Sequence, residues 1–301
     1  MLGKGGMAYV YRATERANGI NVAIKVMNGV VARTSPGRQR FLREVEVMTA
    51  IRHPNVVHIY ACGHLNGGEP YLVMEYLEGE SLGSLVRRGD RLEIKRAIEI
   101  VTDAAAGLGA AHASGIVHRD VKPDNIFLVG PKGDPKIAKV VDFGLARLYG
   151  SSGLTAKGMI LGTPEYMSPE QAVNDPLDAR TDVYGLGVVM YRLLTGTLPF
   201  HGKNEIELLA SHLAHLPPPI SEIRGEVSVE VEHVVMSAMR KLPRNRYPSM
   251  QDFLEDLERL SGDRQGAIVG PASIWDDVYE PQTAFSKNIA MLLRKKAGLR
   301  S

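Results

Sequence analysis

The stretch HRDVKPDN at residues 118–125 is the most informative part of this sequence, and a second motif, DFG, follows at residues 142–144. Together they place two carboxylates, Asp120 and Asp142, and one carboxamide, Asn125, in order along the chain. The oxygens of Asn125 and Asp142 are ligands suited to Mg²⁺ bound against nucleotide phosphates, and Asp120 is suited to orient a hydroxyl and accept its proton. The pattern therefore predicts phosphoryl transfer.

Each motif alone occurs by chance in many chains, so their combination carries the inference. In chain order, the further motifs are GKGG (3–6), VAIK (22–25), Glu44 and SPE (168–170). This series resembles the protein kinase superfamily, and residues 118–123 and 162–171 are most similar to the bacterial Hanks-type (eukaryotic-like) serine/threonine kinases. The resemblance covers residues 1–261 and implies ATP and Mg²⁺ as cosubstrates, protein substrates and the kinase fold.

Composition agrees with a large globular enzyme. The 301 residues are 44% hydrophobic, which is enough for a sizeable core, and the net charge of +2 argues against nucleic acid as a partner. The single cysteine, Cys62, excludes an intramolecular disulfide and is expected to be a buried thiol between strands. The sequence has neither an apolar signal segment nor a run that could span a membrane, and we expect a cytoplasmic location.

The first part of the chain has the pattern of a small β-sheet. Residues 7–12 and 20–27 alternate in polarity around the turn Asn18-Gly19, and strands are also expected at residues 56–60 and 71–75. Apolar residues at helical spacing between residues 41 and 51 predict one helix that carries Glu44. In the family a longer first strand precedes the glycine loop, so the first strand is expected to be truncated.

The second part has the pattern of helices. Residues 94–113 are rich in alanine and end before Gly115, and residues 183–195 are apolar nearly all round, as in a buried central helix. Residues 229–240 and 250–260 are expected to be the closing helices. The expected fold class is α+β and bilobal: a small antiparallel β-sheet N-lobe (residues 1–76) with one regulatory helix, and a larger, mainly α-helical C-lobe (residues 77–261).

The resemblance implies a nucleotide site between the glycine loop and a hinge at residues 77–79. Gly3 and Gly5 would let the backbone approach the triphosphate, and Lys25, paired with Glu44, would orient the α- and β-phosphates. The other residues implied to bind the nucleotide are Leu2, Val10, Ala23, Glu75, Leu77 and Phe127, with Met74 as gatekeeper. The sequence departs from the family at Ala8, which stands in the place of the third glycine.

The resemblance also assigns the catalytic roles. Asp120 would be the base, Lys122 would steady the γ-phosphate, and Asn125 and Asp142 would hold Mg²⁺. Lys122 and Thr163 match the serine/threonine class, and Glu170 is expected to pair with Arg246 beneath the platform that binds the substrate.

Residues 149–157 stand where the activation loop belongs. Thr155 is the leading phosphosite, with Ser151 and Ser152 as rivals, and the plain alternative is a mobile loop. The family implies autophosphorylation in trans, and so self-association. Arg119 would then pair with the phosphate.

The last forty residues, 262–301, leave the family pattern and end in a basic amphipathic helix over residues 284–301. This segment would contact an anionic membrane surface, dock on the kinase, or remain a solvated tail. Two functions from different classes stay open: an active protein serine/threonine kinase, or a pseudokinase that acts as a nucleotide-gated binding module. Lys25, Asp120, Asn125 and Asp142 are all present, which favours the enzyme.

Overall fold

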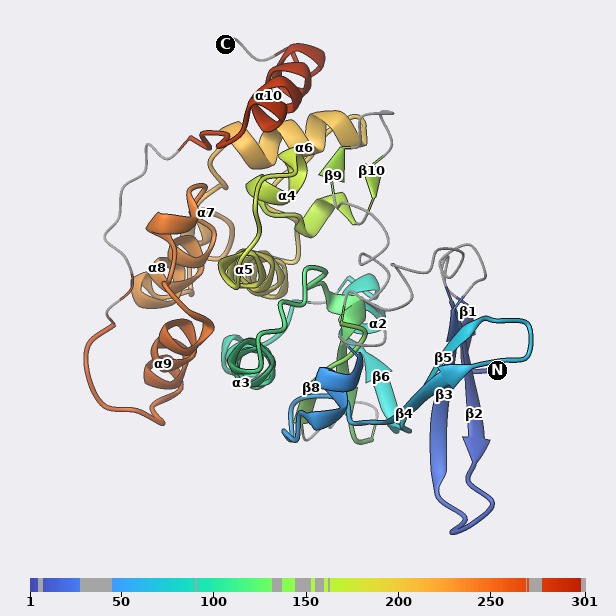
Figure 1. Cartoon of the computed structure of the whole chain (residues 1–301). Coiled ribbons are helices and arrows are strands. Elements are labelled where there is room, and N and C mark those ends of the chain that lie inside the picture. Colours follow the sequence, from blue (N-terminus) through green and yellow to red (C-terminus); the bar gives the residue numbers. More distant parts are fainter. Residues whose placement is uncertain are drawn as a thin grey trace.

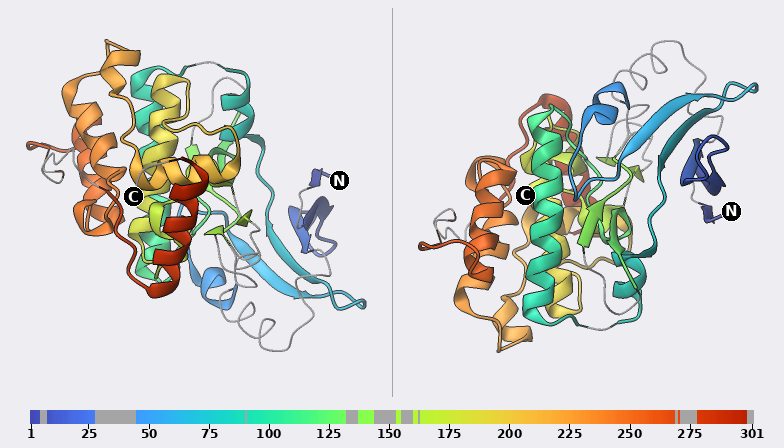
Figure 2. Two further views of the ribbon diagram at one scale, coloured as in Figure 1. Left: turned by 90° about the horizontal axis from the view of Figure 1, so that it is seen from above. Right: turned by 90° about the horizontal axis from the view of Figure 1, so that it is seen from below.

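The computed structural model describes residues 1–4, 8–27, 45–89, 91–131, 137–143, 153–154, 160–161, 163–268, 270 and 278–298. Figure 1 shows a sheet-rich N-terminal part and a larger helical part joined by a short connection, in agreement with the predicted bilobal α+β class. Figure 2 shows the same separation from two further directions, with strands β2 and β3 on one side and the long helices on the other.

The N-lobe contains a five-stranded antiparallel sheet with the strand order β1-β2-β3-β5-β4. Its strands are β1 (Gly3–Lys4), β2 (Ala8–Thr14), β3 (Asn21–Met27), β4 (Ile59–His64) and β5 (Pro70–Glu75). The predicted hairpin is confirmed, and Gly19 takes a φ of +74° at its turn, a conformation that glycine adopts without strain. Residues 45–50 are helical, as the apolar spacing predicted.

The predicted strand at residues 56–60 is wrong in its bounds, because β4 begins only at Ile59. Val56 instead forms an isolated bridge with Val140, and the Val57 amide donates to the Val140 carbonyl at 2.9 Å. Both valines are buried against the C-lobe sheet, so their apolar character reflects a contact between lobes. Cys62 lies within β4 and is only partly buried, which corrects the expectation of a buried thiol between strands.

A second sheet lies just beyond the hinge. Its antiparallel strands are β6 (Gly79–Ser81), β7 (Ile126–Val129) and β8 (Ile137–Val140). Gly79, expected in the hinge, already belongs to β6, and a β-carbon there would collide with the carbonyl oxygen of Leu128. Strand β7 begins directly after the catalytic-loop motif (residues 118–125), and one residue, Val141, separates the end of β8 from Asp142.

The C-lobe is mainly helical, as predicted. Its helices are α2 (Leu82–Arg87), α3 (Ile94–Ala113), α4 (Pro169–Val173), α5 (Arg180–Thr195), α6 (Glu205–Ala214), α7 (Ile220–Ile223), α8 (Val229–Ala238) and α9 (Met250–Ser261). Short 3-10 helices cover Pro123–Asn125, Pro164–Tyr166 and Pro243–Asn245, and a two-stranded ladder joins β9 (Gly153–Leu154) to β10 (Ile160–Leu161). The sequence analysis did not predict α2, α4, α6 or α7.

Helix α5 occupies the centre of the C-lobe (Figure 1), and all of its residues except Arg180 and Arg192 are buried. It packs against α3, α8 and α9. A β-carbon at Gly187 would lie 2.9 Å from the β-carbon of Ala238, so a side chain at this position would force α5 and α8 apart. The predicted buried central helix is thus confirmed, and it begins three residues before Val183.

After α9 the chain returns to the C-lobe as α10 (Ala284–Lys296), which lies against α6 and α4. Figure 1 and the left view of Figure 2 show this helix, in red, across α6. The predicted amphipathic helix is therefore present, and the solvated-tail interpretation is wrong for residues 278–298. Across the described parts of the chain, the model contains no helix with the length and apolar character needed to cross a membrane.

Candidate active site

The catalytic-loop motif lies between α3 and β7 and is held in place by the buried ring of His118. The amide of Asp120 donates to His118 Nδ1 at 3.2 Å, so Nε2 carries the ring proton and donates to the Val141 carbonyl at 3.0 Å. This one side chain links the loop to the residue that precedes Asp142. The ring of Phe143, which is 3% exposed, packs on His118 with 4.7 Å between the ring centroids.

Asp182, in the first turn of α5, holds the backbone of the same loop. Its carboxylate accepts hydrogen bonds from the amides of His118 (2.7 Å) and Arg119 (2.8 Å) and from Nε2 of His112 (2.7 Å). Burial would raise the pKa of Asp182, but the bonds from His112 and the His118 amide hold it below its ordinary value. The three bonds stabilise Arg119 at a φ of +63°, a conformation that costs free energy for a residue other than glycine.

The sequence analysis missed Asp182, because the predicted helix began at the next residue. The available signal was a lone carboxylate at the start of an otherwise apolar helix, where it can meet backbone amides and the positive end of the helix dipole.

Asp120 lies in a cluster with three other polar side chains. Its Oδ2 atom is 2.9 Å from Nζ of Lys122 and accepts a hydrogen bond from Nδ2 of Asn125 at 3.0 Å. Lys122 Nζ also donates to Oγ1 of Thr163 at 2.9 Å, which ties the catalytic loop to residues 163–167. A small pocket beside Asp120 is lined by Asp120 and Thr163, by further residues of the catalytic loop and of residues 166–171, and by the first turns of α5.

Asn125 is almost fully buried, and both of its amide hydrogens are used within the loop. Nδ2 donates to the backbone carbonyl of Asp120 at 2.7 Å as well as to its carboxylate. The atom of this side chain that remains suited to a hard cation is therefore Oδ1.

Asp142 connects the two lobes. Its Oδ1 atom lies 2.8 Å from Nζ of Lys25 on β3, and its backbone has a φ of +55°. Burial would raise the pKa of Asp142, but the Lys25 ammonium, with smaller contributions from His118 and Lys122, holds it below its ordinary value. Lys122, whose charge acts on Asp142, lies 2.9 Å from Asp120, so the Lys25–Asp142 pair and Asp120 lie in the same region of the structure.

The described residues expected at the nucleotide lie mostly on β2, β3 and β5. Val10 is opposite Lys25 in the β2–β3 ladder, and Ala23, which is 6% exposed, is opposite Met74 in the β3–β5 ladder. Leu2 is half exposed, and its amide donates to the Val10 carbonyl at 2.8 Å. Among the described residues outside its immediate neighbours, no atom lies within 4 Å of the position a β-carbon would take at Gly3.

Nearer the hinge, the amide of Glu75 donates to the His58 carbonyl at 2.9 Å, and its carboxylate lies 2.7 Å from Lys139 Nζ. Leu77 packs against the main core, and Phe127 lies on β7 opposite Lys139. Three expected residues, Gly5, Glu44 and Thr155, lie outside the described residues, as do the rival phosphosites Ser151 and Ser152.

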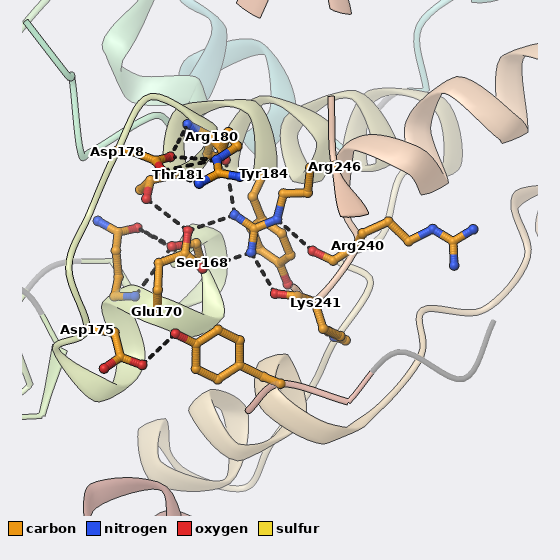
Figure 3. Close-up of polar contacts among 12 residues, drawn as sticks. Ser168, Glu170, Asp175, Asp178, Arg180, Thr181, Tyr184, Arg240, Lys241 and Arg246 are labelled. Carbon is orange, nitrogen blue, oxygen red and sulfur yellow. Dashed lines mark hydrogen bonds and ion pairs between the residues drawn. The ribbon is translucent and has the colours of Figure 1, made fainter. Parts of the chain in front are cut away.

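Helix α4 and its flanking residues, which we call the platform (residues 163–175), belong to a second polar network (Figure 3). The predicted Glu170–Arg246 pair is confirmed: the guanidinium contacts both carboxylate oxygens, at 2.7 and 2.8 Å, and both side chains are buried. Arg246 also donates to the carbonyls of Arg240 and Lys241. Nε2 of Gln171 donates to the Arg119 carbonyl at 2.8 Å, so the platform is joined to the catalytic loop.

Comparisons with known proteins agree with this geometry. The model of the protein kinase domain family matches residues 1–258. The chain is 41% identical over 258 residues to the serine/threonine-protein kinase Pkn1 of Myxococcus xanthus, and 39% identical over 264 residues to the serine/threonine-protein kinase PknB of Mycobacterium leprae.

These alignments cover 85% and 86% of this chain but 37% and 42% of the two relatives, so the chain spans about two fifths of the length of the curated relatives it matches. Its fold is similar to the crystal structure of the Mycobacterium tuberculosis PknI kinase domain, with a TM-score of 0.68 and 26% identity, over 86% of this chain and 93% of that one.

Proposed function

Because the chain belongs to the protein kinase family, we propose that it transfers the γ-phosphoryl group of Mg·ATP to serine or threonine hydroxyls of proteins. The observation that carries the proposal is the meeting of Lys25 and Asp142 at 2.8 Å, beside the cluster of Asp120, Lys122 and Asn125. We assign the catalytic domain to residues 1–261, with the N-lobe at 1–76, the C-lobe at 77–261 and an extension at 262–301.

The nucleotide would lie against the N-lobe strands. Ala23 would leave room for the adenine, with Val10 and Phe127 on its two faces and Leu2, Gly3 and Gly5 near the ribose and phosphates. Because the Glu75 amide is engaged by His58, we assign the Glu75 carbonyl and the backbone of Leu77 to the adenine edge. Lys25, together with Glu44, would orient the phosphates.

Asn125 and Asp142 are the residues that would hold Mg²⁺, which, when bound, supplies positive charge against the phosphate oxygens. Both fit this role: Asn125 has Oδ1 left for a cation, and the lowered pKa of Asp142 keeps its carboxylate ionised at neutral pH. Among the described residues there is no cluster of three or more histidine, cysteine or acidic side chains that could hold a metal. Two protein ligands suit Mg²⁺, because it usually keeps waters and phosphate oxygens as its other ligands.

Asp120 would orient the acceptor hydroxyl and take its proton as the oxygen forms a bond to the γ-phosphorus and the bond to the bridging oxygen of the leaving diphosphate breaks. Lys122, between Asp120 and Thr163, would place a positive charge beside the transferred group. Because mainly positioning and charge are needed, we assign the reaction to five side chains: Lys25 on β3, Asp120, Lys122 and Asn125 in the catalytic loop, and Asp142 after β8.

We further propose that the chain phosphorylates a second copy of itself in trans, at Thr155 or at the neighbouring Ser151 or Ser152. The support is the position of these hydroxyls between Asp142 and the platform in the sequence. Arg119, next to Asp120, would then pair with the new phosphate.

The test is incubation of the full chain with Mg·ATP, followed by phosphate mapping by mass spectrometry and phosphoamino-acid analysis. We expect phosphoserine or phosphothreonine, and a loss of at least about a hundredfold in Asp120→Asn. The matched control is Asp263→Asn, an exposed carboxylate beyond α9, which should behave as the original chain.

Equal incorporation in the original chain and Asp120→Asn would refute the assigned base. Calorimetry with Mg²⁺ and a non-hydrolysable ATP analogue distinguishes the kinase from the pseudokinase. Binding of the analogue by the original chain, together with no phosphate transfer by the original chain, would favour the pseudokinase.

A further inference from the structure

A second apolar cluster lies apart from the main core, where the C-terminal segment meets the platform. Residues 278–298, which we call the strap, contribute four of its buried side chains. The cluster contains Met167, Ala172, Val173, Leu209, Ala210, Leu213, Tyr279, Ile289, Ala290 and Leu293. The strap therefore buries its apolar face against α4, α6 and the residue just before the N-cap of α4.

The helical part of the strap, α10, has a capped N-terminus and an apolar face that packs on the C-lobe. The side chain of Thr283 caps its N-terminus, and Ser286 completes a capping box and is fully buried. On the opposite face Lys287, Lys295 and Met291 are exposed. The helix is thus amphipathic with its apolar side on the kinase C-lobe.

Tyr279 fixes the start of the strap. It is 1% exposed, its hydroxyl donates to Oδ2 of Asp175 at 2.7 Å, and its amide donates to the Leu213 carbonyl at 3.2 Å. The amide of Gln282 adds a second bond to the same Asp175 oxygen, at 2.9 Å. Burial and the nearby carboxylate raise the pKa of Tyr279, so its hydroxyl stays protonated and remains a donor.

Asp175 depends on these two bonds. Its carboxylate is 3% exposed, and among the described residues Oδ1 has no hydrogen-bond partner. In the docked arrangement the strap supplies both donors to this buried carboxylate after α4, so the loss of either donor should cost free energy.

Hydrogen bonds at the two ends of α4 link Asp175 to the catalytic loop. The Asp175 amide donates to the Glu170 carbonyl at 2.9 Å, and the next residue, Gln171, donates from its side chain to the carbonyl of Arg119. Met167, at the other end of α4, is buried in the apolar cluster with the strap. Contacts therefore run without a gap from Tyr279 to the residue beside Asp120.

We propose that the strap docks in cis as a positioning element of the platform, with Tyr279 as the positioning residue that acts through Asp175 and α4 on the binding of the protein acceptor. The inference rests on the proposed kinase activity for its kinetic consequence, but its structural consequence can be measured without phosphoryl transfer. Because, among the described residues, the main contacts of α10 are with α4 and α6, the strap should affect the acceptor and leave the nucleotide unaffected.

The kinetic test uses the full chain as enzyme and the Asp120→Asn chain, with its strap intact, as the protein acceptor. For Tyr279→Phe we expect the KM for the acceptor to rise about fivefold, while the KM for ATP stays within about twofold. An unchanged acceptor KM would overturn the proposal, and so would a lower one, because it would mean that the strap obstructs the acceptor.

The structural test is hydrogen exchange at the amides of residues 167–175. Exchange should be about fivefold faster in Tyr279→Phe and in Leu293→Ala, and unchanged in α3. Met291→Ala is the matched control, because Met291 is on the same helix two residues from Leu293 and is 65% exposed.

Unaltered exchange in both docking variants would overturn the proposal whether or not the chain is an active kinase. If the original chain transfers no phosphate but exchange responds as expected, the proposed function fails and the docked strap stands. If Leu293→Ala does not fold, Tyr279→Phe, which removes only one oxygen atom, decides the question.

Discussion

The ammonium of Lys25 lies 2.8 Å from the Oδ1 atom of Asp142, so a strand of the N-lobe and the segment after β8 meet in a single charged contact. The two side chains are 18% and 38% exposed, so both remain partly accessible to solvent. The contact joins the two lobes and places a cation and an anion where the phosphates and metal of the proposed cosubstrate would lie.

Replacing Lys25 by methionine should abolish most phosphoryl transfer. Methionine has nearly the same length without the charge, so we expect the transfer rate to fall by at least about a hundredfold. The pKa of Asp142 should rise, because burial would remain without its main opposing charge. Rate measurements at saturating Mg·ATP test this, with exposed Lys95→Met as the control. A variant that kept a tenth of the rate would contradict the assignment of Lys25.

Replacing Asp182 by asparagine should disturb the backbone of the catalytic loop, which Asp182 holds through two amides. One carboxylate oxygen that now accepts a backbone amide would be replaced by a donor, so we expect a loss of about 3 kcal/mol in the free energy of unfolding. The transfer rate should also fall, because Arg119 would lose support for its left-handed backbone. Urea unfolding and rate measurements check both effects.

The control for Asp182 is Asp178→Asn, four residues earlier. Asp178 is 52% exposed and pairs with Arg180, so its loss should cost about 1 kcal/mol or less. Equal destabilisation by the two substitutions would contradict the role given to Asp182.

The Glu170–Arg246 pair should make the C-lobe sensitive to acid. Burial would raise the pKa of Glu170, but Arg246 and the Thr181 hydroxyl hold it below its ordinary value of 4.5. The unfolded chain therefore binds this proton more readily, and the stabilisation is present above pH 4.5 and is lost as the pH falls through the lower, folded value.

In Glu170→Gln we expect a loss of about 3 to 5 kcal/mol at neutral pH, because Arg246 would keep a buried charge without its partner. The free energy of unfolding should then depend less on pH between about pH 5 and about pH 3 than in the original chain. Urea unfolding at a series of pH values measures both, and parallel pH profiles in the two chains would count against this account.

Removing the hydroxyl of Thr163 should weaken catalysis without unfolding the protein. Thr163→Val keeps the shape but removes the acceptor of the Lys122 bond, so we expect kcat to fall by about fivefold to tenfold. Thr163→Ser keeps a hydroxyl and should retain most of the activity. Identical rates in the two variants would mean that the Lys122–Thr163 bond has no part in the reaction.

Much of the fold could be predicted because it depends on local pattern. Helix α3 has the bounds that its apolar spacing and Gly115 predicted, and the β2–β3 hairpin follows from alternation around Gly19. The start of strand β4 was predicted three residues too early. Val56 and Val57 are apolar because they contact Val140 of β8, and such a long-range contact cannot be recognised from alternation along the chain.

The candidate site divides in the same way. Asp120, Asn125 and Asp142 belong to short motifs whose residue types alone indicate the proposed chemistry, so the sequence was sufficient to propose them. Asp182 and the pairing of Lys25 with Asp142 involve partners that are far apart in the sequence, so only the packing of α5 and of the two lobes brings them into contact.

The sequence by itself determined the chemistry that we propose for this chain, the bounds of helix α3 and the amphipathic character of the last helix, because each depends on neighbouring residues. Only the tertiary structure decided where that helix packs and that the Tyr279 hydroxyl donates a hydrogen bond to Asp175. An apolar helix face indicates that some surface covers it, but the sequence does not identify that surface. The physical reason is that burial and hydrogen-bond satisfaction belong to the assembled fold, whereas periodicity belongs to the chain.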